Sequence, residues 1–412
     1  MARQEYDGGQ SRGRKTRCLL SVAAVFGGLI AISAPSFAEA VADESARTPH
    51  SSDALVSTSQ VDPIGTEITL PLGGDKSITL VRKDSAIQMD GSVLWRGEVN
   101  ETGERAVLML WNSAALTGYF AYQGTIYTVE NLDGEIRAFA EMDRRRPQPD
   151  HPAPNSRRDS TPAADELPPL RVAPPEPAVP AFQETQRRAL EAKDITIDVM
   201  VLYTSNVAKR YVGSPADLLA LSIEEANQTF GNSGLGNIKL RLVHTQVVDY
   251  DGSKDDQFTH LYTMVDGLGP FKDVRKLRDE KRADIVGLII DNPNGCGLST
   301  RIGPDSDQAF FVVHHACAAV SMSIAHEIGH ILGARHDRFI DDADHPLAYG
   351  HGYVNGTKWR DIMSYKEGCG GCPRIPFWSN PRIAYKGEPL GTPAADNARL
   401  ILELAERVSK FR

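Results

Sequence analysis

Apolar residues are spaced differently in two parts of the chain. From about residue 60 to 142, short runs rich in β-branched and aromatic residues are separated by Gly, Asn and Asp, which is typical of a small all-β domain. From about residue 194 onward, longer apolar runs alternate with stretches of helical periodicity. They predict strands at 195–203, 239–248, 283–290 and 309–315, and helices at 215–230, 317–333 and 393–409. This second part is expected to be one α/β domain with a mixed sheet.

The first 40 residues do not fit either pattern. Arginines and a lysine near the start precede an apolar run of small residues at 18–34, and the segment 36–40 offers small residues at suitable cleavage positions. Residues 1–40 are therefore interpreted as a secretory signal peptide, with a membrane anchor as the alternative. A signal peptide implies a secreted protein, or a periplasmic one in a Gram-negative host, with no stable membrane association once the signal is removed.

A proline-rich segment separates the two predicted domains. Residues 147–180 hold 11 of the 25 prolines and little apolar material, so they are expected to be extended and solvated, and 147–193 is interpreted as a linker. Basic residues at 144–146, at 157–158 and, just beyond the proline-rich stretch, at 187–188 are natural sites for proteolytic cleavage, although they can equally be solvated charges. The predicted domains are thus 41–146 and 194–412.

Composition narrows the partners and the compartment. The chain of 412 residues has a formal net charge of −9, and nothing in that balance indicates nucleic acid as a partner. Four cysteines remain after the predicted signal, an even number that indicates two disulfides in an exported protein. The favoured pairing joins Cys296 to Cys317 and Cys369 to Cys372. A metal site at the CxxC pair is the alternative, but no second CxxC exists to complete it.

The segment AHEIGHILGARHD, 325–337, carries the chemistry. His326 and His330 are four residues apart and share one helix face, where two imidazoles can bind zinc, with Glu327 beside them as a general base. Gly333 can end the helix with a turn that returns His336 as a third ligand. Three histidines leave the fourth position open to water, as a catalytic site for one zinc ion requires. The pattern predicts a zinc-dependent hydrolase.

The longer motif resembles that of the metzincin zinc peptidases. Further similarities are YGHGY (349–353), WRDIMSY (359–365) and CPRIPFWSNP (372–381), and together they most resemble the bacterial, reprolysin-like peptidyl-Asp metallopeptidase group. The resemblance implies that Met363 forms a methionine turn under the metal and that Asp337 braces this turn. It also implies a catalytic or metal-binding Tyr365, as in the astacin and serralysin branches, so the markers of several branches are mixed.

By the same resemblance, 194–412 is a metzincin-like catalytic domain with a mixed twisted sheet and an active-site helix, and its substrates are proteins or peptides. An extended substrate would lie along an edge strand near 295–302. The group's name implies cleavage next to aspartate, and Arg374 on the wall of the pocket is a candidate for recognising that carboxylate. The alternative is that Arg374 only binds the local backbone. Calcium is possible but not indicated.

The β-rich segment 41–146 is expected to be a prodomain that keeps the secreted zymogen latent. A permanent adhesion or substrate-binding domain is the alternative. Two other functions also remain open at this point. A zinc-folded binding domain without activity is disfavoured by Glu327 and the open fourth position, and a zinc hydrolase of non-peptide substrates is disfavoured by the full motif.

Overall fold

The computed structural model describes residues 54–57, 65–73, 76–87, 92–111, 115–123, 125–132, 135–140, 175–210, 215–292, 294–319, 321–344 and 347–412. The predicted signal peptide and the first part of the predicted linker lie outside these residues. Residues 49–412 form one compact unit. Among the described residues, no helix combines the length and the apolar character needed to cross a bilayer.

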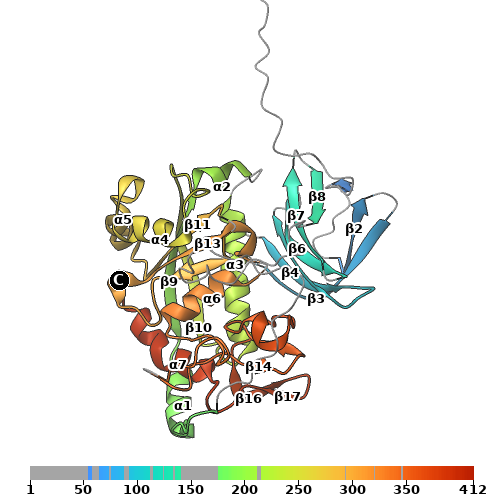
Figure 1. The fold of residues 1–412 in the computed structure, drawn as a ribbon. Coiled ribbons are helices and arrows are strands. Elements are labelled where there is room, and N and C mark those ends of the chain that lie inside the picture. The colour runs from blue at the N-terminus through green and yellow to red at the C-terminus, as the bar shows by residue number, and fades with distance from the viewer. Residues whose placement is uncertain are drawn as a thin grey trace, which may run out of the picture. The chain divides into compact units, whose positions relative to one another are not determined.

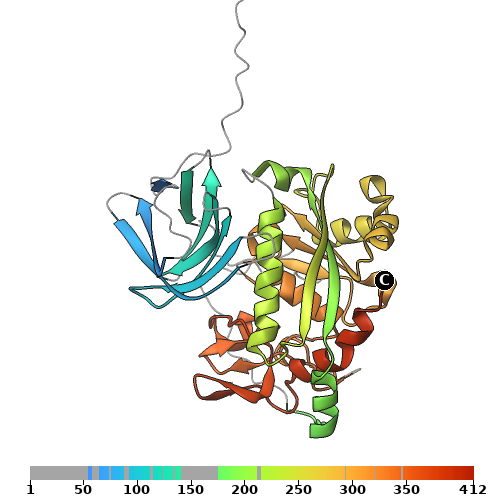
Figure 2. The same cartoon turned by 180° about the vertical axis from the view of Figure 1, so that it is seen from behind.

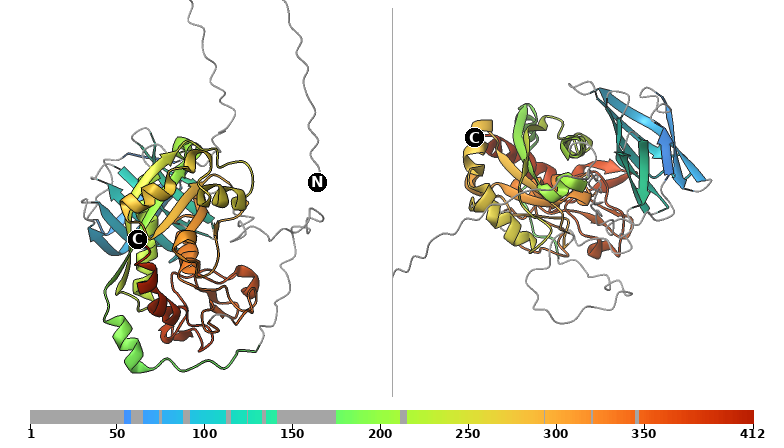
Figure 3. Two further views of the ribbon diagram at one scale, coloured as in Figure 1. Left: turned by 90° about the vertical axis from the view of Figure 1, so that its left-hand side faces the viewer. Right: turned by 90° about the horizontal axis from the view of Figure 1, so that it is seen from above.

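The front part of this unit is an antiparallel sheet in which sequence neighbours pair by hairpins (Figure 3). Its order is β1-β8-β7-β6-β5-β4-β3-β2, and apolar side chains from alternate positions of the strands fill one interior around Trp95 and Phe120. The strands are β1 Ala54–Ser57, β2 Glu67–Gly73, β3 Lys76–Ile87, β4 Val93–Val99, β5 Arg105–Trp111, β6 Ala115–Tyr122, β7 Thr125–Leu132 and β8 Glu135–Ala140. The all-β prediction for this region is confirmed.

The second part contains a mixed five-stranded sheet of order β10-β9-β11-β13-β12, in which only β12 runs antiparallel (Figure 1). The strands are β9 Ile195–Thr204, β10 Ile238–Val248, β11 Ile285–Ile290, β12 Gly297–Ser299 and β13 Phe310–His314. All six residues of β11 are buried, as expected for a strand covered on both faces. The predicted α/β fold is confirmed.

Helices cover both faces of this sheet. One face packs against α3 Pro215–Asn232, which runs along β10 (Figure 2), and against α6 Ser323–Ile331 and α7 Asn397–Val408. The other face packs against α4 Gln257–Val265 and α5 Val274–Lys281. Smaller elements are α1 Glu184–Glu191, α2 Ser205–Arg210, the hairpin strands β14 Val354–Asn355, β15 Trp359–Arg360, β16 Asn380–Tyr385 and β17 Glu388–Leu390, and several 3-10 turns.

One predicted boundary was wrong. The active-site helix begins at Ser323, not at 317, because a 3-10 turn at His315–Cys317 and a left-handed Met322 precede it. Residues 184–191, which lie beyond the proline-rich stretch 147–180, form a helix. Arg187 in that helix pairs with Glu184 and Glu191, so the pair 187–188 belongs to ordered secondary structure.

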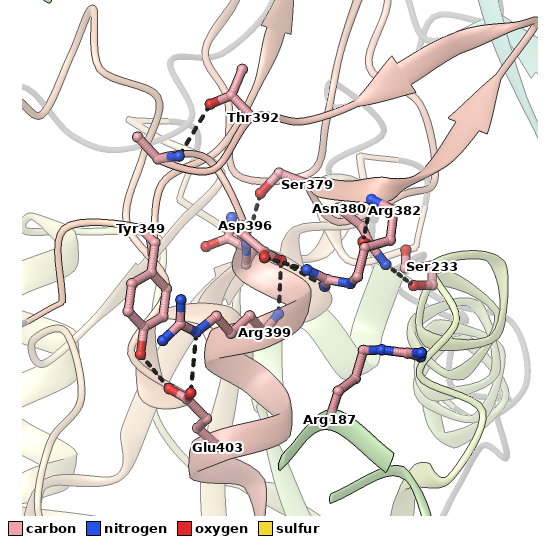
Figure 4. A network of polar contacts seen from close by, with 12 residues as sticks. Arg187, Ser233, Tyr349, Ser379, Asn380, Arg382, Thr392, Asp396, Arg399 and Glu403 are labelled. Atoms are coloured by element: carbon pink, nitrogen blue, oxygen red, sulfur yellow. Dashed lines mark hydrogen bonds and ion pairs between the residues drawn. The ribbon is translucent and has the colours of Figure 1, made fainter. Parts of the chain in front are cut away.

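A polar network anchors the C-terminal helix to the loops around the metal motif (Figure 4). Asp396 caps α7 by accepting a hydrogen bond from the backbone N–H of Arg399, and Arg382 donates to both of its carboxylate oxygens. Tyr349 and Arg399 both donate to Glu403 one turn further along. The network holds in place the loop that starts with YGHGY. Within it, the guanidinium of Arg382 is paired with Asp396.

Candidate active site

The active-site helix presents two histidines from its buried face, and the chain then turns back to add a third. Gly333 has a φ of 101°, which only glycine adopts readily, and the helix ends just before it, at Ile331. Two backbone hydrogen bonds close the turn: the N–H of Gly333 donates to the carbonyl of His330, and the N–H of Ala334 donates to that of Gly329. The glycine therefore reverses the chain, and His336 comes to lie beside the helix.

The ring nitrogens of the three histidines converge. The Nε2 atom of His336 lies 2.9 Å from that of His330 and 3.3 Å from that of His326. A tetrahedral zinc ion with bonds of about 2.0–2.1 Å would hold its ligand nitrogens about 3.3–3.4 Å apart. His326 and His330 are buried and His336 is half-buried. The triad fits a catalytic metal ion.

Backbone carbonyls orient two of the rings. Nδ1 of His326 lies 2.8 Å from the carbonyl oxygen of Ile362, and Nδ1 of His330 lies 2.8 Å from that of Ala334. A carbonyl only accepts, so each Nδ1 carries the proton and each Nε2 keeps its lone pair for a metal. This arrangement fixes the tautomer that metal binding needs.

His351 contacts the backbone of His336, the third histidine of the triad. It is fully buried, and its ring nitrogens lie 2.9 Å from the carbonyl oxygen of His336 and 3.1 Å from that of Ala343. Burial lowers its pKa. The sequence pattern does not indicate this role, although His351 lies in the YGHGY segment. The other histidine of that loop, His345, lies outside the described residues.

The segment 361–365, called here the methionine segment because it contains Met363, lies against the active-site helix. Met363 is fully buried, and a Cβ atom on Gly329 would lie 2.8 Å from its sulfur, so the thioether packs directly on the helix beside His330. The ring of Tyr365 lies 4.4 Å from that of His336, centroid to centroid. Residues 361–365 are thus placed next to all parts of the triad.

Two buried carboxylates hold this segment. Asp337 accepts hydrogen bonds from the backbone N–H groups of Tyr365 and Phe339, and Asp361 accepts from Ser364 and from the backbone N–H of Ser379. Burial raises the pKa of Asp337 to about 6 and that of Asp361 to about 7, although these hydrogen bonds act in the opposite direction. Both carboxylates thus accept hydrogen bonds from residues in this segment.

Glu327 faces the edge of the sheet. A Cβ atom on Gly297, the first residue of β12, would lie 2.5 Å from Oε1 of Glu327, and Glu327 itself is fully buried. Strand β12 is the edge of the sheet nearest the helix, and it lies within the range 295–302 expected for the substrate-binding edge. The sequence did not reveal that Gly297 makes room for the Glu327 carboxylate.

The cysteines pair as the sequence favours. Cys296 is bonded to Cys317, and Cys369 to Cys372. The first bond joins the segment before β12 to the segment before the active-site helix. Both bonds are consistent with an extracytoplasmic location.

Comparison with known proteins agrees with this geometry. The family model described as Metallo-peptidase family M12 matches residues 193–379. A protein of Xanthomonas campestris pv. campestris named peptidyl-Asp metalloendopeptidase is 31% identical over 366 residues, covering 85% of this chain and 83% of its own length. The chain belongs to metallopeptidase family M12.

Two further proteins are also similar to this chain. A Stenotrophomonas maltophilia protein, also named peptidyl-Asp metalloendopeptidase, is 31% identical and covers 82% of this chain and 81% of its own. The crystal structure of metalloproteinase-II from Bacteroides fragilis aligns with a TM-score of 0.42 at 13% identity, covering 82% of this chain and 91% of that one. As a family M12 member, the chain is a metalloendopeptidase whose substrates are peptides.

Proposed function

We propose that this protein is a secreted zinc endopeptidase that cleaves bonds next to aspartate and is made as a latent precursor. One observation carries the proposal. The Nε2 atoms of the triad converge, and Glu327, the residue after His326 on the same helix, lies against Gly297 of the edge strand. Ligands, base and substrate-binding edge therefore meet at one place.

Glu327 is the proposed general base. When bound, a zinc ion would polarise the peptide carbonyl and lower the pKa of a water molecule to about 7. Glu327 then takes the proton of the attacking water and delivers it to the leaving amine. Tyr365, whose ring lies beside that of His336, is placed to stabilise the negative charge that develops on the carbonyl oxygen.

The proposed substrate lies antiparallel to β12, where main-chain hydrogen bonds hold it in an extended form. The absence of a side chain at Gly297 gives Glu327 its space. Main-chain recognition alone accepts many sequences, so a preference for aspartate needs a cationic partner in the pocket.

Arg374 is our candidate for that partner. Its guanidinium donates to the carbonyl oxygens of Ser321 and Ser364, at 2.9 and 3.3 Å, which anchors it between the segment before α6 and the methionine segment. The names of the two peptidyl-Asp metalloendopeptidases that resemble this chain support a preference for aspartate. If Arg374 only anchors the backbone, replacing it would lower stability and leave the cleavage preference unchanged.

The front sheet is our proposed proregion. It precedes the segment that the family model matches, and its residues Arg105 and Tyr119 both donate to the buried carboxylate of Glu225 in α3. Apolar side chains of β4, β5 and β6 pack with Leu221 of the same helix. Through these contacts the front sheet packs on a specific surface of the catalytic domain.

The test is cleavage of casein and of matched Asp and Asn peptides by the secreted protein, with mass spectrometry of the products and of the protein's own N-terminus. We expect cleavage beside aspartate, its loss on chelation and recovery with zinc, and an N-terminus near 190. Glu327→Gln should keep zinc and lose activity by orders of magnitude. Near-normal turnover of a zinc-loaded Gln variant would refute the role of Glu327, and an intact N-terminus on the active enzyme would refute the proregion.

A further inference from the structure

A second cluster of metal-binding side chains lies at the carboxyl ends of two parallel strands. Strands β11 and β13 are neighbours in the sheet (Figure 1), and Ile290, the last residue of β11, pairs with His314. Asp291 and His315 are the next residues on each chain. The ligand atoms of Asp291, His314 and His315 all lie within 4.8 Å of one another, and none of these residues belongs to the His326 triad.

The distances in this cluster suit a single ion. Nε2 of His315 lies 3.2 Å from Oδ1 of Asp291, close to the separation of about 3.3 Å between two ligands of one tetrahedral ion. The rings of His314 and His315 meet edge to face, with centroids 4.5 Å apart. This spacing is similar to that of the catalytic triad.

His314 supplies the decisive observation. Its side chain is more than nine-tenths buried, and its Nδ1 has no hydrogen-bond partner in the described structure. An ion pair between Asp291 and His315 would leave this nitrogen unsatisfied, which is unfavourable for a buried polar group. A metal ion would satisfy it.

A neighbouring arginine orients the carboxylate of the cluster. Arg210 contacts Oδ2 of Asp291, which leaves Oδ1 on the side of the histidines and orients the carboxylate from outside.

We propose that Asp291, His314 and His315 form a second metal site that takes a divalent first-row transition ion such as zinc. Two imidazoles and one carboxylate are a donor set for such ions and not for calcium, which prefers oxygen ligands alone. The ion would join the ends of β11 and β13 at the start of the loop to β12. The disulfide of Cys296 and Cys317 closes the other end of that loop.

The experiment counts zinc in the full secreted chain, in a Glu327→Gln background that prevents self-cleavage. After dialysis against buffered zinc, elemental analysis should give two zinc ions per chain. Adding His314→Gln or Asp291→Asn should reduce the count to one, whereas the control His244→Gln, on β10 and outside both clusters, should keep two. His330→Ala, in the catalytic triad, should also leave one ion, and combining it with His314→Gln should leave none.

One zinc ion per chain in the Glu327→Gln parent would overturn the proposal and leave the cluster as an ion-pair network. A count of two zinc ions per chain in His314→Gln, in Asp291→Asn and in the double variant His330→Ala with His314→Gln would overturn it as well. If the His314 and Asp291 variants do not fold, the count in the parent, compared with His330→Ala, still decides. Because the His326 triad is counted separately, failure of this proposal leaves the proposed peptidase untouched.

Discussion

The carboxylate of Asp337 accepts a hydrogen bond of 2.8 Å from the backbone N–H of Tyr365. The residue directly after the third histidine is thereby tied to the end of the methionine segment. Its other oxygen accepts from the backbone N–H of Phe339 at 3.1 Å, and the side chain is only 1% exposed. One buried side chain therefore sets the distance between His336 and Tyr365.

Asp337→Asn should weaken this connection. Asparagine offers one acceptor in place of two, so one backbone N–H would face an amide donor at a cost of about 1–3 kcal/mol. We expect lower stability, measured by urea unfolding, and a lower kcat with zinc still bound. The control is Asp342→Asn on the exposed part of the following loop, which should change neither. Wild-type kcat in Asp337→Asn would show that the bond does not position the site.

Gly297→Ala should damage activity more than stability. The new methyl group would lie 2.5 Å from Oε1 of Glu327, the end of a side chain that can move aside, so the backbone need not shift. Displacing a catalytic base by about 1 Å can lower the reaction rate about 100-fold. We expect a fall of that order in kcat/KM with zinc content unchanged. Gly236→Ala is the matched control, because a Cβ atom there meets nothing within 4 Å. Equal activities of the two variants would contradict the contact.

Asp361 should make stability depend on pH. Burial raises its pKa to about 7, whereas the unfolded chain releases this proton near pH 3.9. The folded state thus holds more protons between these values, so stability is highest below about pH 4 and declines as the pH rises to about 7, by up to roughly 1.4 kcal/mol per pH unit. Asp361→Asn cannot ionise and should lack this decline.

The measurement is urea unfolding of both proteins at pH 5 and pH 7.5 in chelator, so that metal content is equal. The stability of Asp361→Asn relative to the wild type should improve at the higher pH. Parallel behaviour of the two proteins would mean that Asp361 is not held protonated.

Glu225→Gln should loosen the proposed proregion. Glu225 is 1% exposed and accepts from Arg105 and Tyr119, so its neutralisation leaves the half-buried guanidinium of Arg105 without its anionic partner. Limited proteolysis of the precursor should remove the front sheet faster, and the mature enzyme should keep its activity. Glu280→Gln on the exposed side of α5 is the control. An unchanged rate of removal would argue against this contact as an anchor.

The sequence predicted the catalytic sheet well because its central strands are continuous apolar runs. It predicted the metal ligands because their spacing follows from the geometry of one helix and one glycine turn. Helix α5 was missed since its sequence, VRKLRDEK, is almost entirely charged and buries only Val274 and Arg278. Helix α1 was missed for a similar reason: none of its residues is fully buried, and charged pairs along it supply its local contacts.

Other parts of the site depend on contacts between distant residues. His351 acts on the backbone of His336, fifteen positions away, and nothing in its own neighbourhood indicates this contact. Gly297 meets Glu327 only because β12 reaches the edge of the sheet beside α6. The helix start at Ser323 likewise follows a 3-10 turn whose last residue, Cys317, is bonded to the distant Cys296.

The rings of His326 and His330 are oriented by the carbonyls of Ile362 and Ala334. Main-chain groups are present whatever residue occupies a position, so these two contacts survive any substitution that keeps the chain path. The walls of the pocket can therefore diverge among relatives, or be redesigned, without altering how the ligands are presented. Changes in cleavage preference and loss of the metal should arise at different positions of this protein.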